Sequence, residues 1–260
     1  MIIKSAMALL AASLSLAMSA VFPSTASAKE NAMSRQANVI LVHGAWADGS
    51  SWSKVIPLLV ARGVNVTAVQ LPLTTLDDDV ATVKRALALE TGPTILVGHS
   101  YGGAVITEAG NDPKVSGLVY VAAFAPDAGQ SAGSMQSGAP PAPMGAQLKP
   151  DAQGFLKLSR EGVFEDFAQD LSPEEKLVLF AAQSPTNAKS LGGVITTAAW
   201  RGKRSWYIIA SQDRAIPPEL EAIMAKTLGA DTISLPSSHV AMLSHPKEVA
   251  AVIMKAVDHN

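Results

Sequence analysis

Residues 94–103 read Thr-Ile-Leu-Val-Gly-His-Ser-Tyr-Gly-Gly, an apolar run that passes directly into a glycine-rich turn. The run predicts a buried strand, and the stretch 104–109 that follows it predicts a helix. Residues 98–102 match the pattern G-x-S-x-G, in which a sharp strand-to-helix turn exposes the side chain of the central serine. Glycine on both sides lets the strand and the helix pass closely. We therefore expect Ser100 to be a nucleophile.

A glycine-rich turn between a strand and a helix can also bind a phosphate group. A Walker loop would require Gly-Lys-Ser/Thr, which is missing here, and G-x-G-x-x-G cannot be laid over these residues. The nucleophile interpretation is therefore favoured. His99, the neighbour of Ser100, is expected to be structural and to lie on the side turned away from the site.

Further apolar runs follow the same pattern along the chain. They cover residues 39–42, 64–69, 94–97, 117–124, 206–209 and 232–235. Continuous apolar runs, as opposed to alternating ones, are typical of strands covered on both faces of a parallel sheet. Helical patterns lie between them, near residues 77–87, 217–228 and 246–257. The sequence predicts an α/β fold: a doubly wound, mostly parallel sheet of about six strands with helices on both faces.

Residues 127–200 interrupt this alternation and show no convincing strand. Prolines at 140, 141 and 143 oppose regular structure, and Ser172-Pro-Glu-Glu175 has the form of a helix-capping box. Phenylalanines are frequent farther along the segment. We expect a helical lid insertion over about 127–200, because this segment is long for the alternative, a plain helical crossover.

The N-terminal 28 residues predict a secretory signal peptide. Lys4 precedes an apolar run, and Ala26-Ser-Ala28 supplies the small residues of a cleavage site. A membrane anchor is the alternative, but the apolar core is too short to span a bilayer comfortably. The expected product is an exported protein, periplasmic or secreted, whose one folded domain occupies residues 29–260 and which is not stably inserted in a membrane after cleavage.

Composition excludes several classes of function. The chain has no cysteine, which rules out disulfides, a thiol nucleophile and thiolate metal sites. Its formal charge is −2, and the Lys and Arg residues are scattered, so neither nucleic acid nor an anionic membrane is an expected partner. The histidines lack metal-ligand spacing, and we expect no metal. A small molecule is the expected partner.

A serine nucleophile needs a base that is oriented by an acid, and in folds with this elbow the chain order is serine, acid, histidine. His239 follows the last predicted strand, whereas His245 begins the final helix and His259 lies in the tail. His239 is therefore the expected base. Two acids compete: Asp213 follows the strand at 206–209, and Asp127 follows the preceding strand. Asp213 is favoured, because it has the commoner position for the orienting acid.

The intermediate of acyl transfer needs two hydrogen-bond donors for its oxyanion. The expected donors are the backbone amides of Tyr101 and Ala45, the latter in the loop after the first strand. Gly44 lets that loop approach, and His43 is expected to brace it. Two apolar side chains, Trp46 and Phe124, are expected to line the substrate pocket, although Trp46 could instead simply pack in the interior.

These motifs together resemble the α/β-hydrolase family. They are His43-Gly-Ala-Trp46, Gly98-His-Ser-Tyr-Gly-Gly103, Asp213 and His239. The chain is most similar to the branch of small esterases and hydroxynitrile lyases, which includes plant methyl-ester esterases, over residues 38–258. The resemblance implies a carboxylesterase that needs no cofactor and cleaves small to medium, largely apolar esters through an acyl-enzyme.

Alternatives remain within this family. The same site can support a lyase or a cofactor-free, peroxidase-like enzyme, and some plant relatives are ligand receptors with slow turnover. The lyases of this branch carry a lysine directly after the catalytic histidine and a threonine at the position of Gly44. This chain has Val240 and Gly44 there. These two residues favour ester hydrolysis, and a predicted signal peptide disfavours the receptor.

Overall fold

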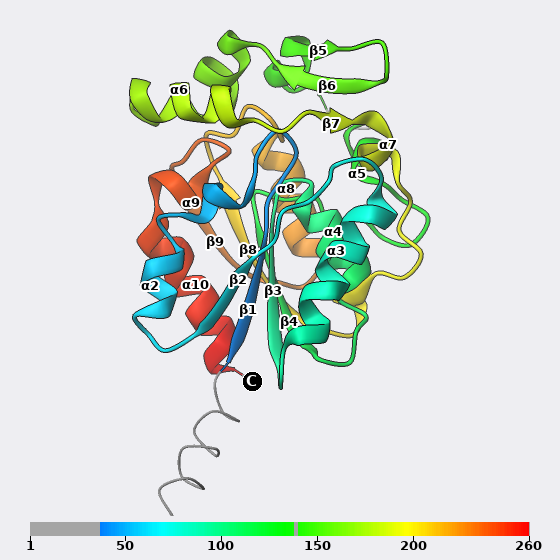
Figure 1. Cartoon of the computed structure of the whole chain (residues 1–260), viewed down its shortest axis with the longest axis vertical. Coiled ribbons are helices and arrows are strands. Elements are labelled where there is room, and N and C mark those ends of the chain that lie inside the picture. The colour runs from blue at the N-terminus through cyan, green and yellow to red at the C-terminus, as the bar shows by residue number, and fades with distance from the viewer. Residues whose placement is uncertain (1–36, 138–139, 260) are drawn as a thin grey trace, which may run out of the picture. The chain divides into compact units, whose positions relative to one another are not determined.

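The computed structural model describes residues 37–137 and 140–259. The predicted signal peptide, residues 1–28, and the start of the mature chain near Lys29 lie outside the described residues. A six-stranded sheet forms the centre of the described part, and every neighbouring pair of strands in it is parallel. The strand order is β2-β1-β3-β4-β8-β9 (Figure 1). The bounds are β1 Asn38–Val42, β2 Asn65–Ala68, β3 Thr94–His99, β4 Val115–Val121, β8 Arg204–Ala210 and β9 Asp231–Leu235.

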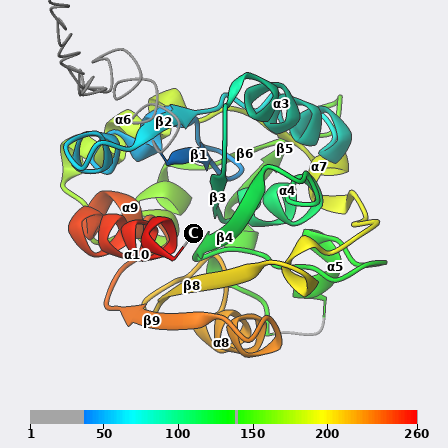
Figure 2. The same cartoon turned by 90° about the horizontal axis from the view of Figure 1, so that it is seen from below.

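Helices cover both faces of this sheet, which confirms the predicted doubly wound α/β fold. Figure 2 shows α2 and α10 on one face and α3, α4 and α8 on the other. All residues of β1 and β3, the strands that precede the Gly44 loop and Ser100, are buried. Their continuous apolar sequence follows from cover on both faces. The helix bounds are α2 Ile56–Val60, α3 Leu76–Leu89, α4 Gly102–Ala109, α8 Pro218–Thr227, α9 Ala241–Ser244 and α10 Pro246–Asp258.

Local sequence explains where these helices begin. The Thr75 side chain accepts a hydrogen bond from the amide of Asp78 and so caps α3, whose first turn carries three aspartates at the positive end of the helix dipole. Helix α8 begins at Pro218 and α10 at Pro246, and proline fits the first turn because it lacks the amide that would have no partner there. The parallel crossovers bring the carboxyl ends of all six strands to one edge of the sheet.

A cap formed by the chain between β4 and β8 lies over this edge (Figure 1). The predicted capping box is present at α6, where both reciprocal hydrogen bonds of Ser172 and Glu175 form. The cap contains α5 Ala132–Gln136, a 3₁₀ turn Pro143–Gln147, β5 Leu148–Pro150, β6 Phe155–Leu158, a π-helical turn Gly162–Phe167, α6 Pro173–Ala182, β7 Thr186–Asn187, α7 Ala188–Gly192 and a 3₁₀ turn Ala199–Arg201.

The expected helical lid insertion also contains strands, which the sequence did not predict. Strands β5, β6 and β7 form a small antiparallel sheet. A hairpin joins β5 to β6, and its turn depends on Asp151, whose Oδ1 accepts hydrogen bonds from the amides of Gln153 and Phe155. Gly154 completes the turn at φ +84°. The strands have two to four residues each, too few for an alternating pattern to be visible.

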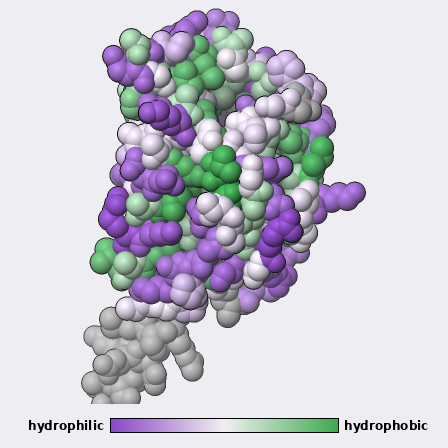
Figure 3. Space-filling model, turned by 90° about the vertical axis from the view of Figure 1, so that its right-hand side faces the viewer, coloured by the Kyte–Doolittle hydropathy of each residue, from purple (hydrophilic) through white to green (hydrophobic). Residues whose placement is uncertain are grey.

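Hydrophilic residues cover much of the face seen in Figure 3, and hydrophobic residues gather near its middle, below the cap. Within residues 37–137 and 140–259, no helix has both the length and the apolar character needed to cross a bilayer.

Candidate active site

Ser100 lies between β3 and α4 with a φ of +53°, a left-handed conformation that costs free energy for any residue with a side chain. Three backbone hydrogen bonds fix it there. The Ser100 amide donates to the carbonyl of Val121 at 3.2 Å, and the Ser100 carbonyl accepts from the amides of Gly103 at 3.0 Å and Phe124 at 3.1 Å. The structure therefore contains the strained elbow that the G-x-S-x-G pattern predicts.

The loop after β1 reaches this elbow because Gly44 has no side chain. A Cβ atom at Gly44 would lie 2.7 Å from the Cβ of Ser100, which is closer than two such atoms can approach. His43 braces the loop, as predicted. Its Nε2 accepts from the amide of Leu71 at 2.9 Å, so Nδ1 carries the proton and donates to the carbonyl of Gly44 at 2.8 Å. Burial lowers the pKa of His43 and keeps the ring neutral.

His239 and Asp213 lie together at the same edge of the sheet. His239 Nδ1 is 2.5 Å from Asp213 Oδ2, and both side chains are buried. The other oxygen of Asp213 accepts from the amides of Ala215 at 2.6 Å and Ile216 at 2.9 Å. These donors stabilise the carboxylate as an anion and fix its direction.

The competing candidates lie elsewhere. Asp127 forms an ion pair with Arg201 at the surface, and this pair holds the pKa of Asp127 below its usual range. The structure therefore brings Asp213, and not Asp127, to the histidine. His245 is the N-cap residue of α10, as predicted, and the Nδ1 of His259 donates to the carbonyl of Lys255 in its own helix.

His99 contacts His239 directly, which corrects the expectation that it is turned away. Its Nε2 lies 2.9 Å from the backbone carbonyl of His239, and the two ring centroids are 4.7 Å apart. Burial holds the pKa of His99 well below its usual value, so the neutral ring donates one hydrogen bond to that carbonyl. Its role is structural, as expected, and it supports the loop that carries His239.

The two expected oxyanion donors are the amides of Ala45 and Tyr101. Within the described residues, neither amide has a hydrogen-bond partner. The hydroxyl group of Tyr101 donates to Asp79 Oδ2 at 2.7 Å. Asp79 also accepts from the amide of Leu73, yet burial raises its pKa to about 6. The side chain of Tyr101 is thus anchored in the interior, while its amide stays free.

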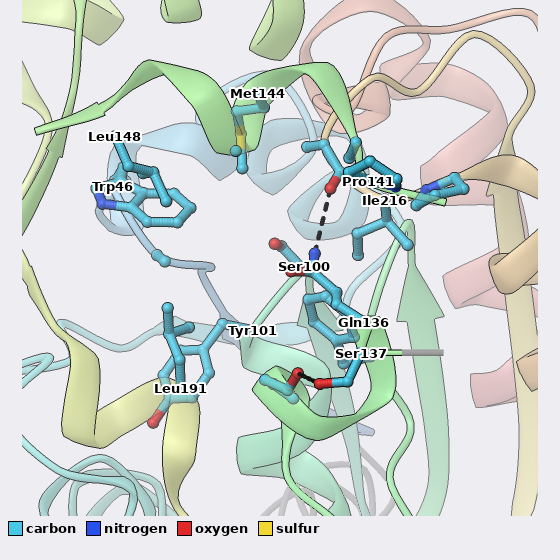
Figure 4. A pocket seen from close by; sticks show the side chains of 18 of the residues that line it. Trp46, Ser100, Tyr101, Gln136, Ser137, Pro141, Met144, Leu148, Leu191 and Ile216 are labelled. Carbon is cyan, nitrogen blue, oxygen red and sulfur yellow. Dashed lines mark hydrogen bonds between the residues drawn. The ribbon is translucent and has the colours of Figure 1, made fainter. Parts of the chain in front are cut away.

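A cavity of about 400 Å³ opens beside Ser100 and lies between the sheet edge and the cap. Trp46 and Leu148 lie on one side of it, and Pro141 and Ile216 on the opposite side (Figure 4). None of its lining residues is charged. Trp46 and Phe124 both line it, as expected. The lining residues are Ala45, Trp46, Ser100, Tyr101, Phe124, Ala132, Gly133, Gln136, Ser137, Pro140, Pro141, Ala142, Met144, Gly145, Leu148, Leu191, Ala215, Ile216 and Pro217.

The cap is hydrogen-bonded to the loop that carries the expected oxyanion donor Ala45. The amide of Trp46 donates to Thr186 Oγ1 at 3.1 Å, and its indole Nε1 donates to the carbonyl of Leu156 at 3.0 Å. Trp46 has a φ of +56°, so these two bonds hold a strained residue in place. Cap strands β6 and β7 therefore position the loop next to Ala45.

The cap also contacts the loops of the acid and the histidine. Asp166 pairs with Arg214 beside Asp213, at 2.7 Å. Asp170 accepts from the amide of Ser238 at 2.8 Å, and the ring centroid of Phe167 lies 5.1 Å from that of His239. The loops that carry Ala45, Asp213 and His239 are thus held by the cap as well as by their own strands.

Sequence reasoning missed these supporting residues. Nothing in the local sequence around Thr186, Phe167 or Asp170 identifies a partner more than 60 residues away. Glu221 was also missed, and here a signal existed. It lies on the same face of α8 as Met224 and Ala225, three and four positions later, and that spacing predicts a buried carboxyl group.

Within residues 37–137 and 140–259, no group of three or more His, Asp or Glu side chains could hold a metal ion. The polar groups at the carboxyl edge of the sheet include the buried Asp213–His239 pair and two amides without a partner among the described residues.

Comparisons with known proteins show the family of this chain. A pyrethroid hydrolase of Sphingobium wenxiniae is 29% identical over 256 residues, covering 85% of this chain and 88% of the relative. Methylesterase 7 of Arabidopsis thaliana is 26% identical over 261 residues, covering 86% and 97%. The crystal structure of a pyrethroid hydrolase from Sphingobium faniae superimposes with a TM-score of 0.75 at 26% identity, over 85% of this chain and 97% of that one. The family model described as the alpha/beta hydrolase family matches residues 39–252, and the chain therefore belongs to the alpha/beta hydrolase family.

Proposed function

We propose that this protein is a carboxylesterase in which Ser100 is the nucleophile, His239 the general base and Asp213 the orienting acid. The observation that carries the proposal is the hydrogen bond between the buried Asp213 and His239, formed at the sheet edge where the Ser100 elbow lies. Because Asp213 occupies Nδ1 of the imidazole, Nε2 is the nitrogen that exchanges a proton with the serine.

The reaction follows from these positions. The Ser100 oxygen attacks the ester carbonyl, and His239 takes the serine proton. The amides of Ala45 and Tyr101, which have no partner among the described residues, donate to the oxyanion that forms. His239 then returns the proton to the leaving alcohol, and an acyl-enzyme remains. Water, deprotonated by His239, attacks the acyl group and releases the acid and Ser100.

The cavity indicates which esters are substrates. Its volume of about 400 Å³ suits a small to medium molecule, and its lining has no charged side chain. An ionised acyl group would lose its hydration there without gaining a partner. Relatives named pyrethroid hydrolase, Methylesterase 7 and carbendazim hydrolyzing esterase support an uncharged ester as the substrate of this chain.

Labelling with a fluorophosphonate tests the nucleophile. The wild-type protein should be labelled at Ser100 and lose its esterase activity, whereas S100A should take no label and retain its circular dichroism spectrum. S53A is the matched control, because Ser53 is exposed and does not line the cavity, and it should be labelled normally. Labelling of S100A at the wild-type rate would contradict the assignment.

A series of nitrophenyl esters tests the substrate class. Each methylene that enters the cavity should stabilise the transition state by about 0.8 kcal/mol, which is roughly fourfold in kcat/KM, until the cavity is full. Efficiency should therefore rise over short acyl chains and fall for long ones. A flat profile, or a preference for charged acyl groups, would contradict an apolar cavity. Cleavage of a cyanohydrin without ester turnover would favour the lyase.

We also propose that the protein is exported. Lys4, the apolar run after it and Ala26-Ser-Ala28 support a signal peptide that is cleaved before Lys29. N-terminal sequencing of the protein from the periplasm or the medium should start at Lys29. An intact N-terminus in the cytosol would contradict the proposal.

A further inference from the structure

A second buried carboxyl group lies behind Asp213. It belongs to Glu221 of α8, which has no solvent exposure. Its Oε2 accepts a hydrogen bond from the amide of Ala210, at the end of β8, at 3.1 Å. Its Oε1 is buried and has no donor among the described residues. The group within hydrogen-bonding reach of this carboxyl is the carboxylate of Asp213.

Two adjacent carboxyl groups in a dry interior cannot both be ionised. Asp213 has three donors: the amides of Ala215 and Ile216, and the Nδ1 of His239. Glu221 has one, the amide of Ala210. The anion is therefore more stable on Asp213, and the shared proton belongs to Glu221. Burial, followed by the charge of Asp213, raises the pKa of Glu221 well above its usual value.

We propose that Glu221 is a positioning residue that keeps its proton and donates a hydrogen bond through it to Asp213, and that this bond sets the basicity of the Asp213–His239 pair. The assignment explains why Oε1 is buried without a donor: a protonated carboxyl group is itself the donor. The effect on catalysis rests on the proposed esterase function, whereas the protonation state of Glu221 does not.

Two other titratable groups act on this pair. From β8, Tyr207 faces both Glu221 and Asp213, and burial together with these carboxyl groups raises its pKa well above the usual value, so it stays neutral. Its hydroxyl donates to the carbonyl of Ala123 at 2.5 Å and gives Asp213 no proton. From the loop after β9, His239 contacts Asp213 Oδ2 through its Nδ1. Glu221 is therefore the acid whose removal changes the environment of Asp213.

Loss of the donor should make Asp213 more basic, because its anion keeps fewer hydrogen bonds. A more basic Asp213 holds the protonated imidazole more tightly, and this favours the protonated state of His239. Since His239 must be neutral to act as a base, the acidic limb of the kcat/KM profile should move to higher pH. We expect a shift of roughly half a unit to one unit in E221L.

The conservative variant separates this role from packing. In E221Q the amide group donates permanently to Asp213, while its oxygen still accepts from Ala210, so the acidic limb should return to the wild-type midpoint. E219L and E219Q on the same helix are matched controls, because Glu219 is exposed. An unshifted midpoint in E221L, or the same shift in E221Q as in E221L, would overturn the proposal.

Infrared spectroscopy tests the proton itself. At about pH 8 ordinary carboxyl groups are ionised, so the carbonyl stretch of a protonated carboxyl in the wild-type protein should be attributable to Glu221. It should disappear in E221Q and persist in E219Q. Absence of the band in the wild-type protein would refute the inference even if esters are cleaved. A band that persists in a protein without ester turnover or fluorophosphonate labelling would instead refute the proposed function.

Discussion

The carboxyl edge of the sheet and the cap above it differ in backbone strain and in buried charge. The edge gathers strained backbone and buried ionisable groups: Ser100 has a φ of +53°, and Asp79, Asp213 and Glu221 are buried. The part of the cap that lines the cavity has no charge and consists of short elements, among them α5 and the 3₁₀ turn Pro143–Gln147.

This difference shows that the two regions need different amounts of structural support. Strained and desolvated groups cost free energy, and they persist where the surrounding structure fixes them from several sides. Buried parallel strands provide that support at the sheet edge. The cap needs only an apolar surface and a few hydrogen bonds to the loops below, such as those of Thr186 and Asp170. In the proposed reaction, the sheet edge therefore supplies the catalytic groups, and the cap selects the substrate.

The largest expected effect tests whether the acid comes from the sheet edge. D213N should lower kcat by orders of magnitude, because an amide in place of the carboxylate no longer holds the imidazole in the correct tautomer. The equivalent change in a serine protease costs about 10⁴-fold. Steady-state kinetics on a short nitrophenyl ester measure it. D127N should change kcat less than threefold.

The D127N variant removes an acid of the same type from the cap side of β4. Its ion pair with Arg201 is exposed at the surface, so its loss should leave the geometry at His239 intact. If D127N proved the more damaging of the two, the comparison between edge and cap would be reversed, and the loop after Pro126 would supply the acid.

An intermediate effect concerns the loss of protein stability when the buried Asp79 at the sheet edge ionises. Burial raises the pKa of Asp79 from 3.8 to about 6, so the folded state binds a proton more tightly than the unfolded state. The stability that follows is fully present below about pH 4 and is lost as the pH rises through about 6. Relative to D79N, the wild-type protein should therefore lose up to about 3 kcal/mol of unfolding free energy across this window.

Urea denaturation at several pH values measures this difference. Asparagine keeps an oxygen for the amide of Leu73 and a nitrogen that can pair with the Tyr101 hydroxyl, so the variant should fold. Groups that titrate in both proteins cancel in the comparison. A constant difference in unfolding free energy from pH 4 to pH 7 would mean that Asp79 ionises in the folded protein without a cost in stability. Burial at the sheet edge would then not disfavour the charged carboxylate.

The smallest expected effect concerns a hydrogen bond between the cap and the sheet edge. In T186V the amide of Trp46 loses its acceptor in the cap, and the neighbouring amide of Ala45 should be held less accurately. Removal of a whole oxyanion donor typically costs 10²–10³-fold in kcat, so displacement of one should cost about tenfold, with little change in KM. T232V is the control, because Thr232 is exposed on β9. Equal kcat values for T186V and T232V would mean that the hydrogen bond from the cap does not affect catalysis.

Sequence alone predicted the sheet domain well, because its signals are local. Continuous apolar runs identified the strands, and Pro218 and Pro246 begin helices where expected. The cap was predicted less well. Its strands β5, β6 and β7 are too short to show a period, and the prolines near residue 140 concealed the 3₁₀ turn that begins at Pro143. Asp151 and Gly154 were the available signals for the hairpin.

The site shows the same division. Ser100, Asp213 and His239 could be placed from chain order and from their positions after strands, since parallel strands bring such residues to one edge. Contacts between distant segments could not be placed. The ring of His99 lies against His239, and Thr186 holds Trp46 across 140 residues of sequence, because the tertiary fold alone determines these pairs.

The position of β9 has a consequence for how the enzyme responds to warming. Ser100, the proposed nucleophile, follows β3, an interior strand with a neighbour on each side. His239, the proposed base, follows β9, which pairs with β8 alone and is exposed at Thr232, Ile233 and Ser234. Edge strands open locally at lower free energy than interior ones. Moderate heating should therefore displace His239 while Ser100 keeps its position. Ester turnover should then decrease reversibly before the circular dichroism spectrum changes. Amide hydrogen exchange would show β9 as the first strand of the large sheet to lose protection.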